Sequence, residues 1–157
     1  MIATLMVGAA LAAQNVTAAN EPVRCADDRI VETPERCLEP DPAPGPYMVF
    51  FRWGGSVIDR DGAAILDQVV AVLNSQEVPY RLVLRGFSDR SGPAGVNKRI
   101  AQERATLVRA QLAARGVPSG SIILEKAGGE EDPLVETADG VREAQNRRVE
   151  ILFDRID

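Results

Sequence analysis

Apolar residues along the C-terminal part of the chain follow two alternating rhythms, one helical and one strand-like. Helical spacing runs through residues 65–73 and again through 96–115, and Gly116 is placed to end the second helix in a left-handed conformation. A strand-like run precedes each helical pattern, at 47–51 and at 80–85, and in the second run leucines alternate with arginines and a valine. Up to Gly116 the pattern therefore predicts the order β-α-β-α.

Two further strand-like runs follow, at 122–127 and at 147–153. Residues 128–145 between them are acidic, hold glycines and a proline and keep no period, so we expect an irregular excursion there. Because no crossover helix precedes the last strand, a mixed sheet is favoured over a fully parallel one. The predicted fold class is α/β (α+β): a two-layer sandwich of order β-α-β-α-β-β, in which a mixed four-stranded sheet is covered by two helices.

The N-terminal part of the chain carries features of an exported protein. Residues 1–18 hold no charged side chain and begin with an apolar run shorter than the roughly 20 residues that a membrane span needs. Small residues follow at Val16-Thr17-Ala18, as a signal peptidase requires, although no lysine or arginine precedes the apolar run. We expect 1–18 to be a signal peptide, with no transmembrane span left after cleavage and the protein in the periplasm. The alternative is a mis-assigned start site or a truncated leader.

A short polar segment, 19–38, carries both cysteines of the chain, Cys25 and Cys37. In an oxidising compartment they are expected to form a disulfide, worth about 3 kcal/mol in the chain-entropy model; the alternative is two idle thiols. Residues 39–46 are rich in alternating prolines and predict a semi-rigid linker. The remaining residues, 47–157, form the predicted domain.

Composition excludes several classes of function. The chain has no histidine, which excludes Ser-His and Cys-His catalysis and imidazole metal sites, and two cysteines cannot form a four-thiolate zinc site. We expect no metal and no cofactor. The net charge of −5 argues against nucleic acid as a partner, since phosphate binding depends on clustered lysines and arginines. Most of that charge lies in 19–46, so the domain is nearly neutral, which suits a zwitterionic ligand.

One group of polar residues stands out at the start of the long helix. Asp89 lies in the turn-rich loop before the helix, while Asn97 and Arg104 share one helical face with Ala101 and Val108. Because helical side chains lean toward the N-terminus, Arg104 is expected to point back toward Asp89. A cleft with a carboxylate, a guanidinium and a helix N-terminus would take the ammonium and carboxylate groups of an amino acid.

A purely structural interpretation of the same residues stays open. An Asp–Arg pair at a loop–helix junction is more often a salt bridge than a binding site. Arg147, at the start of the last strand, is expected at the rim of the cleft. Arg148 is expected to point the other way with Glu150, as an ordinary ion pair.

Three blocks of sequence, in order and at fitting distances, resemble the OmpA-like C-terminal domain, the module shared with the peptidoglycan-associated lipoprotein of Gram-negative envelopes. The resemblance covers roughly residues 47–154. The blocks are Gly86-Phe87-Ser88-Asp89-Arg90-Ser91-Gly92; then Asn97 with Glu103-Arg104-Ala105, Val108 and Gly116-Val117; and finally Gln145-Asn146-Arg147-Arg148-Val149-Glu150-Ile151.

The resemblance implies non-covalent binding of the diaminopimelate in peptidoglycan stem peptides. In that family the acid of the loop motif and an arginine fifteen residues later grip the free amino-acid end of diaminopimelate, and these correspond to Asp89 and Arg104. The family's helix asparagine corresponds to Asn97, and the first arginine of its final block to Arg147. Ser88 replaces the family's threonine and keeps a hydroxyl, so it joins the expected ligand-binding residues.

The sequence also departs from the family pattern. Phe87 stands where the family usually has histidine, which removes a polar group. At the end of the first strand the family commonly carries two acids, and this chain has Arg52 and Gly54 in their place. An added cation and a lost carboxylate near the cleft are expected to weaken or retune binding.

The leading hypothesis is a non-catalytic protein that binds diaminopimelate-type peptidoglycan and links the outer envelope to the cell wall, with other envelope proteins as further partners. The alternative is an envelope interaction protein of the same fold whose cleft has drifted and binds another protein. An enzyme that cuts glycan strands would need two acids held about 5–9.5 Å apart, and nothing in the sequence fixes such a pair.

Overall fold

The computed structural model describes residues 23–25, 30–32 and 43–156. The chain divides into two units, Met1–Pro42 and Ala43–Asp157. In the first, β1 (Val23–Arg24) pairs antiparallel with β2 (Ile30–Val31). The predicted signal peptide, Cys37 and the start of the predicted linker lie outside the described residues. The domain ranges, the signal peptide and the disulfide therefore remain predictions.

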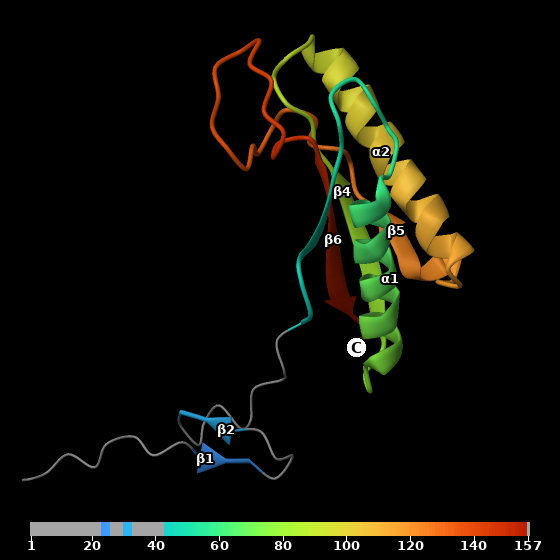
Figure 1. Ribbon diagram of the computed structural model, residues 1–157. Helices are drawn as coiled ribbons and strands as arrows, with labels where there is room; N and C mark the ends of the chain where they lie inside the picture. The colour runs from blue at the N-terminus through green and yellow to red at the C-terminus, as the bar shows by residue number, and fades with distance from the viewer. Residues whose placement is uncertain (1–22, 26–29, 33–42, 157) are drawn as a thin grey trace, which may run out of the picture. The chain divides into compact units, whose positions relative to one another are not determined.

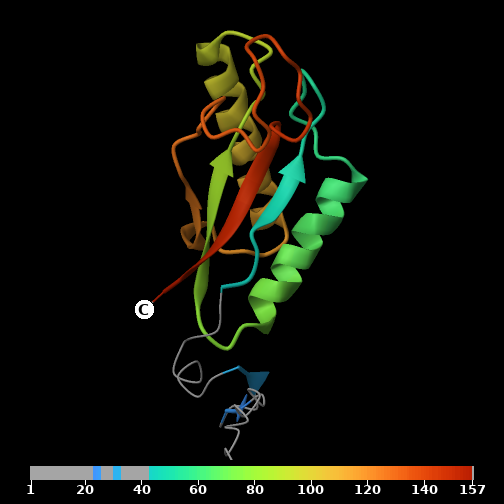
Figure 2. The same cartoon turned by 90° about the vertical axis from the view of Figure 1, so that its left-hand side faces the viewer.

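The second unit is a mixed four-stranded sheet with both helices on one of its faces (Figures 1 and 2). The strands lie in the order β3-β6-β4-β5, and β6 runs antiparallel to both of its neighbours while β4 and β5 are parallel. This confirms the predicted fold class. The bounds are β3 Tyr47–Phe50, α1 Arg60–Ser75, β4 Tyr80–Gly86, α2 Ala94–Ala114, β5 Ile122–Leu124 and β6 Arg148–Arg155, with a short 3-10 turn at Ser119–Ser121.

The start of α1 and the end of α2 are each set by a residue suited to a helix terminus. Asp59 is the N-cap of α1, and its carboxylate accepts a hydrogen bond of 3.0 Å from the Gly62 amide. After α2 the chain turns at Gly116, whose φ of 96° is the left-handed conformation that glycine adopts without strain. No helix among the described residues is long and apolar enough to cross a membrane.

The core lies between the inward face of the sheet and the apolar faces of the helices. Strand residues such as Leu82, Leu84 and Ile151 pack against Leu66 of α1 and Val108 of α2, all of them fully buried. The predicted periodicities therefore identified the buried faces of both helices. The third strand, β5, ends at Leu124 and is shorter than the predicted 122–127. The Glu125 amide makes one more backbone hydrogen bond, to the Leu84 carbonyl at 3.0 Å, just beyond the end of the strand.

Gly86 sets how closely β4 approaches α2. A β-carbon built at this position would lie 2.1 Å from the carbonyl oxygen of Ala101 in α2. Only glycine fits that distance, so the end of β4 lies directly against the helix. The loop that follows Gly86 is thereby held beside the first turns of α2.

The irregular excursion between β5 and β6 is tied down by buried polar side chains. Asn146, fully buried, donates to the Val135 carbonyl at 2.7 Å and accepts from the Val135 amide at 2.9 Å. Arg148 donates to the Asp132 carbonyl and lies 4.0 Å from the centre of the Phe87 ring. Arg148 also pairs with Glu150, as predicted, but it is buried and anchors the excursion as well, so the prediction of an ordinary ion pair was too simple.

Candidate functional site

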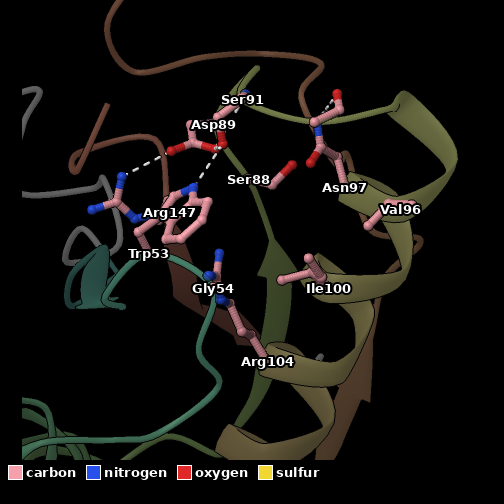
Figure 3. A pocket seen from close by; sticks show the side chains of 11 residues that line it. Trp53, Gly54, Ser88, Asp89, Ser91, Val96, Asn97, Ile100, Arg104 and Arg147 are labelled. Carbon is pink, nitrogen blue, oxygen red and sulfur yellow. Dashed lines mark hydrogen bonds and ion pairs between the residues drawn. The ribbon is translucent and has the colours of Figure 1, made fainter. Parts of the chain in front are cut away.

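A pocket of about 150 Å³ opens where the β4–α2 loop, the start of α2 and the chain after β3 meet (Figure 3). All of the residues predicted to bind a ligand line it. They are Ser88, Asp89, Asn97, Arg104 and Arg147. The structure therefore brings all five predicted residues together at one pocket, although their contacts differ from those expected.

Asp89 is buried and its carboxylate is held from several sides. Ser91 donates to Oδ1 through its hydroxyl at 2.6 Å, and the Glu143 amide donates to Oδ2 at 3.3 Å. Arg147 donates to Oδ2 at 2.8 Å and forms an ion pair with it. Burial alone would raise the pKa of Asp89, but the hydrogen bonds from Ser91 and Arg147 outweigh it and the pKa is lowered. Asp89 is therefore an anion at neutral pH.

Arg147 lies deeper than the rim position expected for it. Besides its pairing with Asp89, its Nε donates to the Phe51 carbonyl at 3.0 Å. The residue is buried, and its backbone carbonyl accepts from the Phe51 amide at 2.8 Å. Arg147 thus joins the end of β3 to the loop that carries Asp89.

Arg104 is 1% exposed and makes no ion pair with Asp89 among the described residues. Its guanidinium instead donates to backbone carbonyls, to Gly55 at 3.0 and 3.1 Å and to Arg52 at 3.3 Å. A longer contact of 3.5 Å joins Nη1 to the Phe87 carbonyl. Arg104 points toward the loop as predicted, but most of its donors hold the chain after β3 rather than standing free for a ligand.

Burial and the neighbouring cation both act on Arg104. Burial, and then Arg147, lower the pKa of Arg104 to about 10, while Asp89 opposes them. Arg104 is still a cation at neutral pH. Of the described residues that line the pocket, Asp89, Arg104 and Arg147 are the charged ones, so the lining holds one more positive than negative charge.

Asn97 closes the pocket at the start of α2. Its side-chain amide donates to the Gly92 carbonyl at 2.9 Å and to the Glu130 carboxylate at 2.6 Å. Asn97 therefore ties the β4–α2 loop to the excursion. Its side-chain oxygen makes no hydrogen bond with the residues that the structure describes.

Ser88 is the predicted site residue whose side-chain polar atom is buried without a hydrogen-bond partner. It is 4% exposed, and its hydroxyl has no hydrogen-bond partner among the described residues. Figure 3 shows this side chain between Asp89 and Asn97, above Ile100. A buried hydroxyl without a partner costs free energy, so a polar atom brought by a ligand would stabilise it.

The apolar walls of the pocket were not predicted. Trp53 forms one side, and Val96 and Ile100 of α2 form the other (Figure 3). Trp53 follows the first predicted strand and was not among the residues predicted to bind a ligand. The signal that could have found it is a large aromatic residue followed directly by glycines, at the strand end where the family carries its acids.

The departures from the family pattern have structural explanations in part. The Phe87 ring does not line the pocket; it is buried against Gly128 and under the Arg148 guanidinium. Gly54 does line the pocket, with a φ of 68°, a conformation that favours glycine. Arg52 is exposed, and its backbone carbonyl accepts from Arg104.

Known proteins resemble this chain in sequence and in fold. The chain is 38% identical over 113 residues to an outer membrane protein of Gluconacetobacter diazotrophicus, and 32% identical over 108 residues to the peptidoglycan-binding protein ArfA of Mycobacterium tuberculosis. These alignments cover 68% and 64% of this chain but only 29% and 33% of those relatives, so the chain spans about a third of their length.

Among solved structures, the peptidoglycan-associated lipoprotein of Burkholderia pseudomallei superposes with a TM-score of 0.61 at 26% identity, over 68% of this chain and 89% of that one. The OmpA-like domain of FopA1 from Francisella tularensis superposes with a TM-score of 0.58 at 18% identity, over 70% and 74%, which shows the shared fold. The model of the OmpA family matches residues 50–147. The chain therefore belongs to the OmpA family.

Proposed function

We propose that this protein binds peptidoglycan non-covalently through the diaminopimelate of the stem peptides, and so links the outer envelope to the cell wall without catalysis. Relatives support the ligand class: ArfA is named as peptidoglycan-binding, and the lipoprotein of B. pseudomallei as peptidoglycan-associated. Relatives named as outer membrane proteins support a place in the periplasm beside the outer membrane.

The observation that carries the proposal is the unpaired Ser88 hydroxyl, buried in a pocket that also holds Asp89 and Arg104. A buried polar group without a partner and an excess of buried positive charge both disfavour the empty pocket. A ligand carboxylate would remove both costs, because it would accept a hydrogen bond from the Ser88 hydroxyl and balance the charge of the Arg104 guanidinium. An ammonium on the same carbon would be drawn to the Asp89 carboxylate.

Because Arg104 already donates to backbone carbonyls, it has fewer N–H groups for a ligand carboxylate than the resemblance implies. Three of its N–H groups point to the Gly55 and Arg52 carbonyls, and the weak Phe87 contact occupies part of Nη1. One Nη1 hydrogen is left for a ligand carboxylate, and Ser88 supplies a second donor. Charge-assisted hydrogen bonds contribute about 1.5–3 kcal/mol each, which after association losses places one site in the range of about micromolar to millimolar.

Co-sedimentation with purified diaminopimelate-type sacculi tests the proposal. We expect the native protein to be retained and to be released by the free tripeptide L-Ala-γ-D-Glu-meso-diaminopimelate. Asp89→Ala and Arg104→Ala should lose retention. Arg104→Lys should lose most of it with less disturbance of the fold, because lysine keeps the charge but cannot reach the same carbonyls and a carboxylate together.

Matched controls lie on the same elements. Arg99 is on α2 but exposed and paired with Glu103, so Arg99→Ala should retain full binding. Equal retention of native protein, Asp89→Ala and Arg104→Lys would overturn the site. Failure of the native protein to sediment would favour the alternative, a protein-binding cleft on the same fold. Release of soluble muropeptides during the assay would contradict a non-catalytic role.

A further inference from the structure

Trp53 is exposed yet fixed in place. Its side chain lines the pocket, and the residue is 53% exposed, a large apolar surface to leave in water. The indole N–H donates to the Ser91 hydroxyl at 3.1 Å. The guanidinium of Arg142 lies 3.6 Å from the centre of the indole ring. An exposed tryptophan normally moves among rotamers, whereas this one is held by contacts from two other loops.

The first of these contacts leads to the buried acid of the pocket. The Ser91 hydroxyl, which accepts from Trp53, itself donates to Asp89 Oδ1 at 2.6 Å. The dashed lines in Figure 3 show that Trp53 and Arg147 approach the Asp89 and Ser91 side chains from the same side of the pocket. The orientation of the indole is therefore set by the same carboxylate that we propose as the ammonium partner.

The second contact comes from the excursion between β5 and β6. Arg142 does not itself line the pocket, but its guanidinium contacts Trp53, which does. The next residue, Glu143, donates its amide to Asp89, which fixes this part of the excursion relative to the site. A guanidinium over an indole is attracted by the negative face of the ring. Arg142 therefore holds Trp53 at the pocket wall.

The wall that Trp53 forms is apolar and faces apolar residues. Val96 and Ile100 lie on the opposite side, with Asp89 above the gap between the two walls and Arg104 below it (Figure 3). An amino-acid head held by Asp89, Ser88 and Arg104 would carry its aliphatic chain out through this gap. The methylene groups would then be covered on both sides.

We propose that Trp53 is a ligand-contact residue that covers the aliphatic chain behind the bound amino-acid head, and that Arg142 is a positioning residue that holds the indole there. This rests on the proposed function, because it assumes that such a head occupies the pocket. It assigns selectivity for a long aliphatic side chain to two residues that the resemblance did not assign to the ligand.

Fluorescence tests the contact directly, because Trp53 is the only tryptophan in the sequence. Titration of the native protein with L-Ala-γ-D-Glu-meso-diaminopimelate should shift the emission to shorter wavelength and reduce quenching by acrylamide, a neutral quencher. Calorimetry on the same samples measures binding independently of the indole. The tripeptide should protect Trp53, while glycine, which has a head but no chain, should not.

Variants separate the two roles. Trp53→Ala should weaken tripeptide binding about tenfold, and Trp53→Phe, which keeps an aromatic face, by about threefold or less. Arg142→Ala should weaken binding about two- to fivefold and raise acrylamide quenching of Trp53 even without ligand; Arg142→Lys should restore part of both. Two controls on the sheet, Phe50→Ala and Arg81→Ala, remove an exposed aromatic and an exposed cation and should change neither.

The outcomes distinguish this inference from the function it rests on. No calorimetric binding of the tripeptide by native protein overturns the proposed function and the inference with it. If the native protein binds the tripeptide but the emission of Trp53 does not change, the inference alone is overturned. The same holds if Trp53→Ala and Arg142→Ala both bind the tripeptide as tightly as the native protein does. Equal losses of affinity in Arg142→Ala and Arg81→Ala would overturn the positioning role of Arg142, because the loss would then follow from the net charge of the protein.

Discussion

Asp89 is paired with Arg147 across 2.8 Å, while Arg104, on the helix that begins beside it, turns its guanidinium to backbone carbonyls. The carboxylate is thus neutralised by the residue directly before β6, and Arg104 serves first as an anchor for the chain after β3. The site is consequently built before any ligand arrives. Its charges are held in position by contacts with the protein itself, which lowers the cost of ordering them on binding.

The buried pair is expected to matter for stability far more than pairs at the surface. Arg147→Met leaves Asp89 buried without its cation, and we expect the free energy of unfolding to fall by about 3–5 kcal/mol. Arg81→Met removes a cation from the exposed pair with Asp154, where each side chain is 45% exposed, and should cost at most about 1 kcal/mol. Urea unfolding measures both, and equal losses would contradict the assignment.

The contribution of Asp89 to stability should also depend on pH. Its pKa is lowered on folding below the ordinary value of 3.8, so the folded state binds fewer protons than the unfolded state in that range. The stabilisation is fully present above about pH 4 and is lost as the pH falls through the folded-state pKa. In urea unfolding from about pH 2 to 6, the difference between native protein and Asp89→Asn should therefore shrink toward low pH. A difference that is constant with pH would argue against the ion pair.

Gly86 provides a steric test of the contact between β4 and α2. Gly86→Ala would place a β-carbon 2.1 Å from the Ala101 carbonyl oxygen, so strand or helix must shift, and we expect a loss of about 1–3 kcal/mol or more. A β-carbon added at Gly95, in the first turn of α2, would meet no heavy atom within 4 Å. Gly95→Ala should leave stability unchanged or raise it by up to about 1 kcal/mol. Thermal melts of the two variants should move apart.

Asn146 offers a test of how the excursion is held. Asn146→Ala leaves the amide and carbonyl of the half-buried Val135 without their partners, which should cost about 1–3 kcal/mol. Amide exchange should become faster within 128–145 and stay unchanged in α1. Uniform acceleration through the whole domain would show that Asn146 supports the fold in general and not this segment.

The sequence was sufficient for the elements whose signals are local. The helical period identified the face of α2 that carries Asn97 and Arg104, because side chains that recur at that spacing must share a face. The pairing of Asp89 with Arg147 could not be found this way. An irregular excursion separates the two residues, and its length does not say where the chain returns.

The role of Trp53 was hidden for a related reason. Its contacts are with Ser91 and Arg142, which lie on two other loops. Nothing periodic connects these positions, and an arginine in an acidic excursion looks like an ordinary surface residue. Only the meeting of three loops at one end of the sheet reveals that the aromatic ring is a wall of the pocket.

The place of β6 in the sheet bears on how the protein matures. This last described strand lies between β3 and β4, and β3 has no other strand as a partner in its sheet. In a chain that becomes available from its N-terminus, α1, β4, α2 and β5 can form early, but β3 can join the sheet only when residues 148–155 are present. Arg147, which lines the pocket, lies directly before β6, so the pocket would be complete only once β6 has joined the sheet.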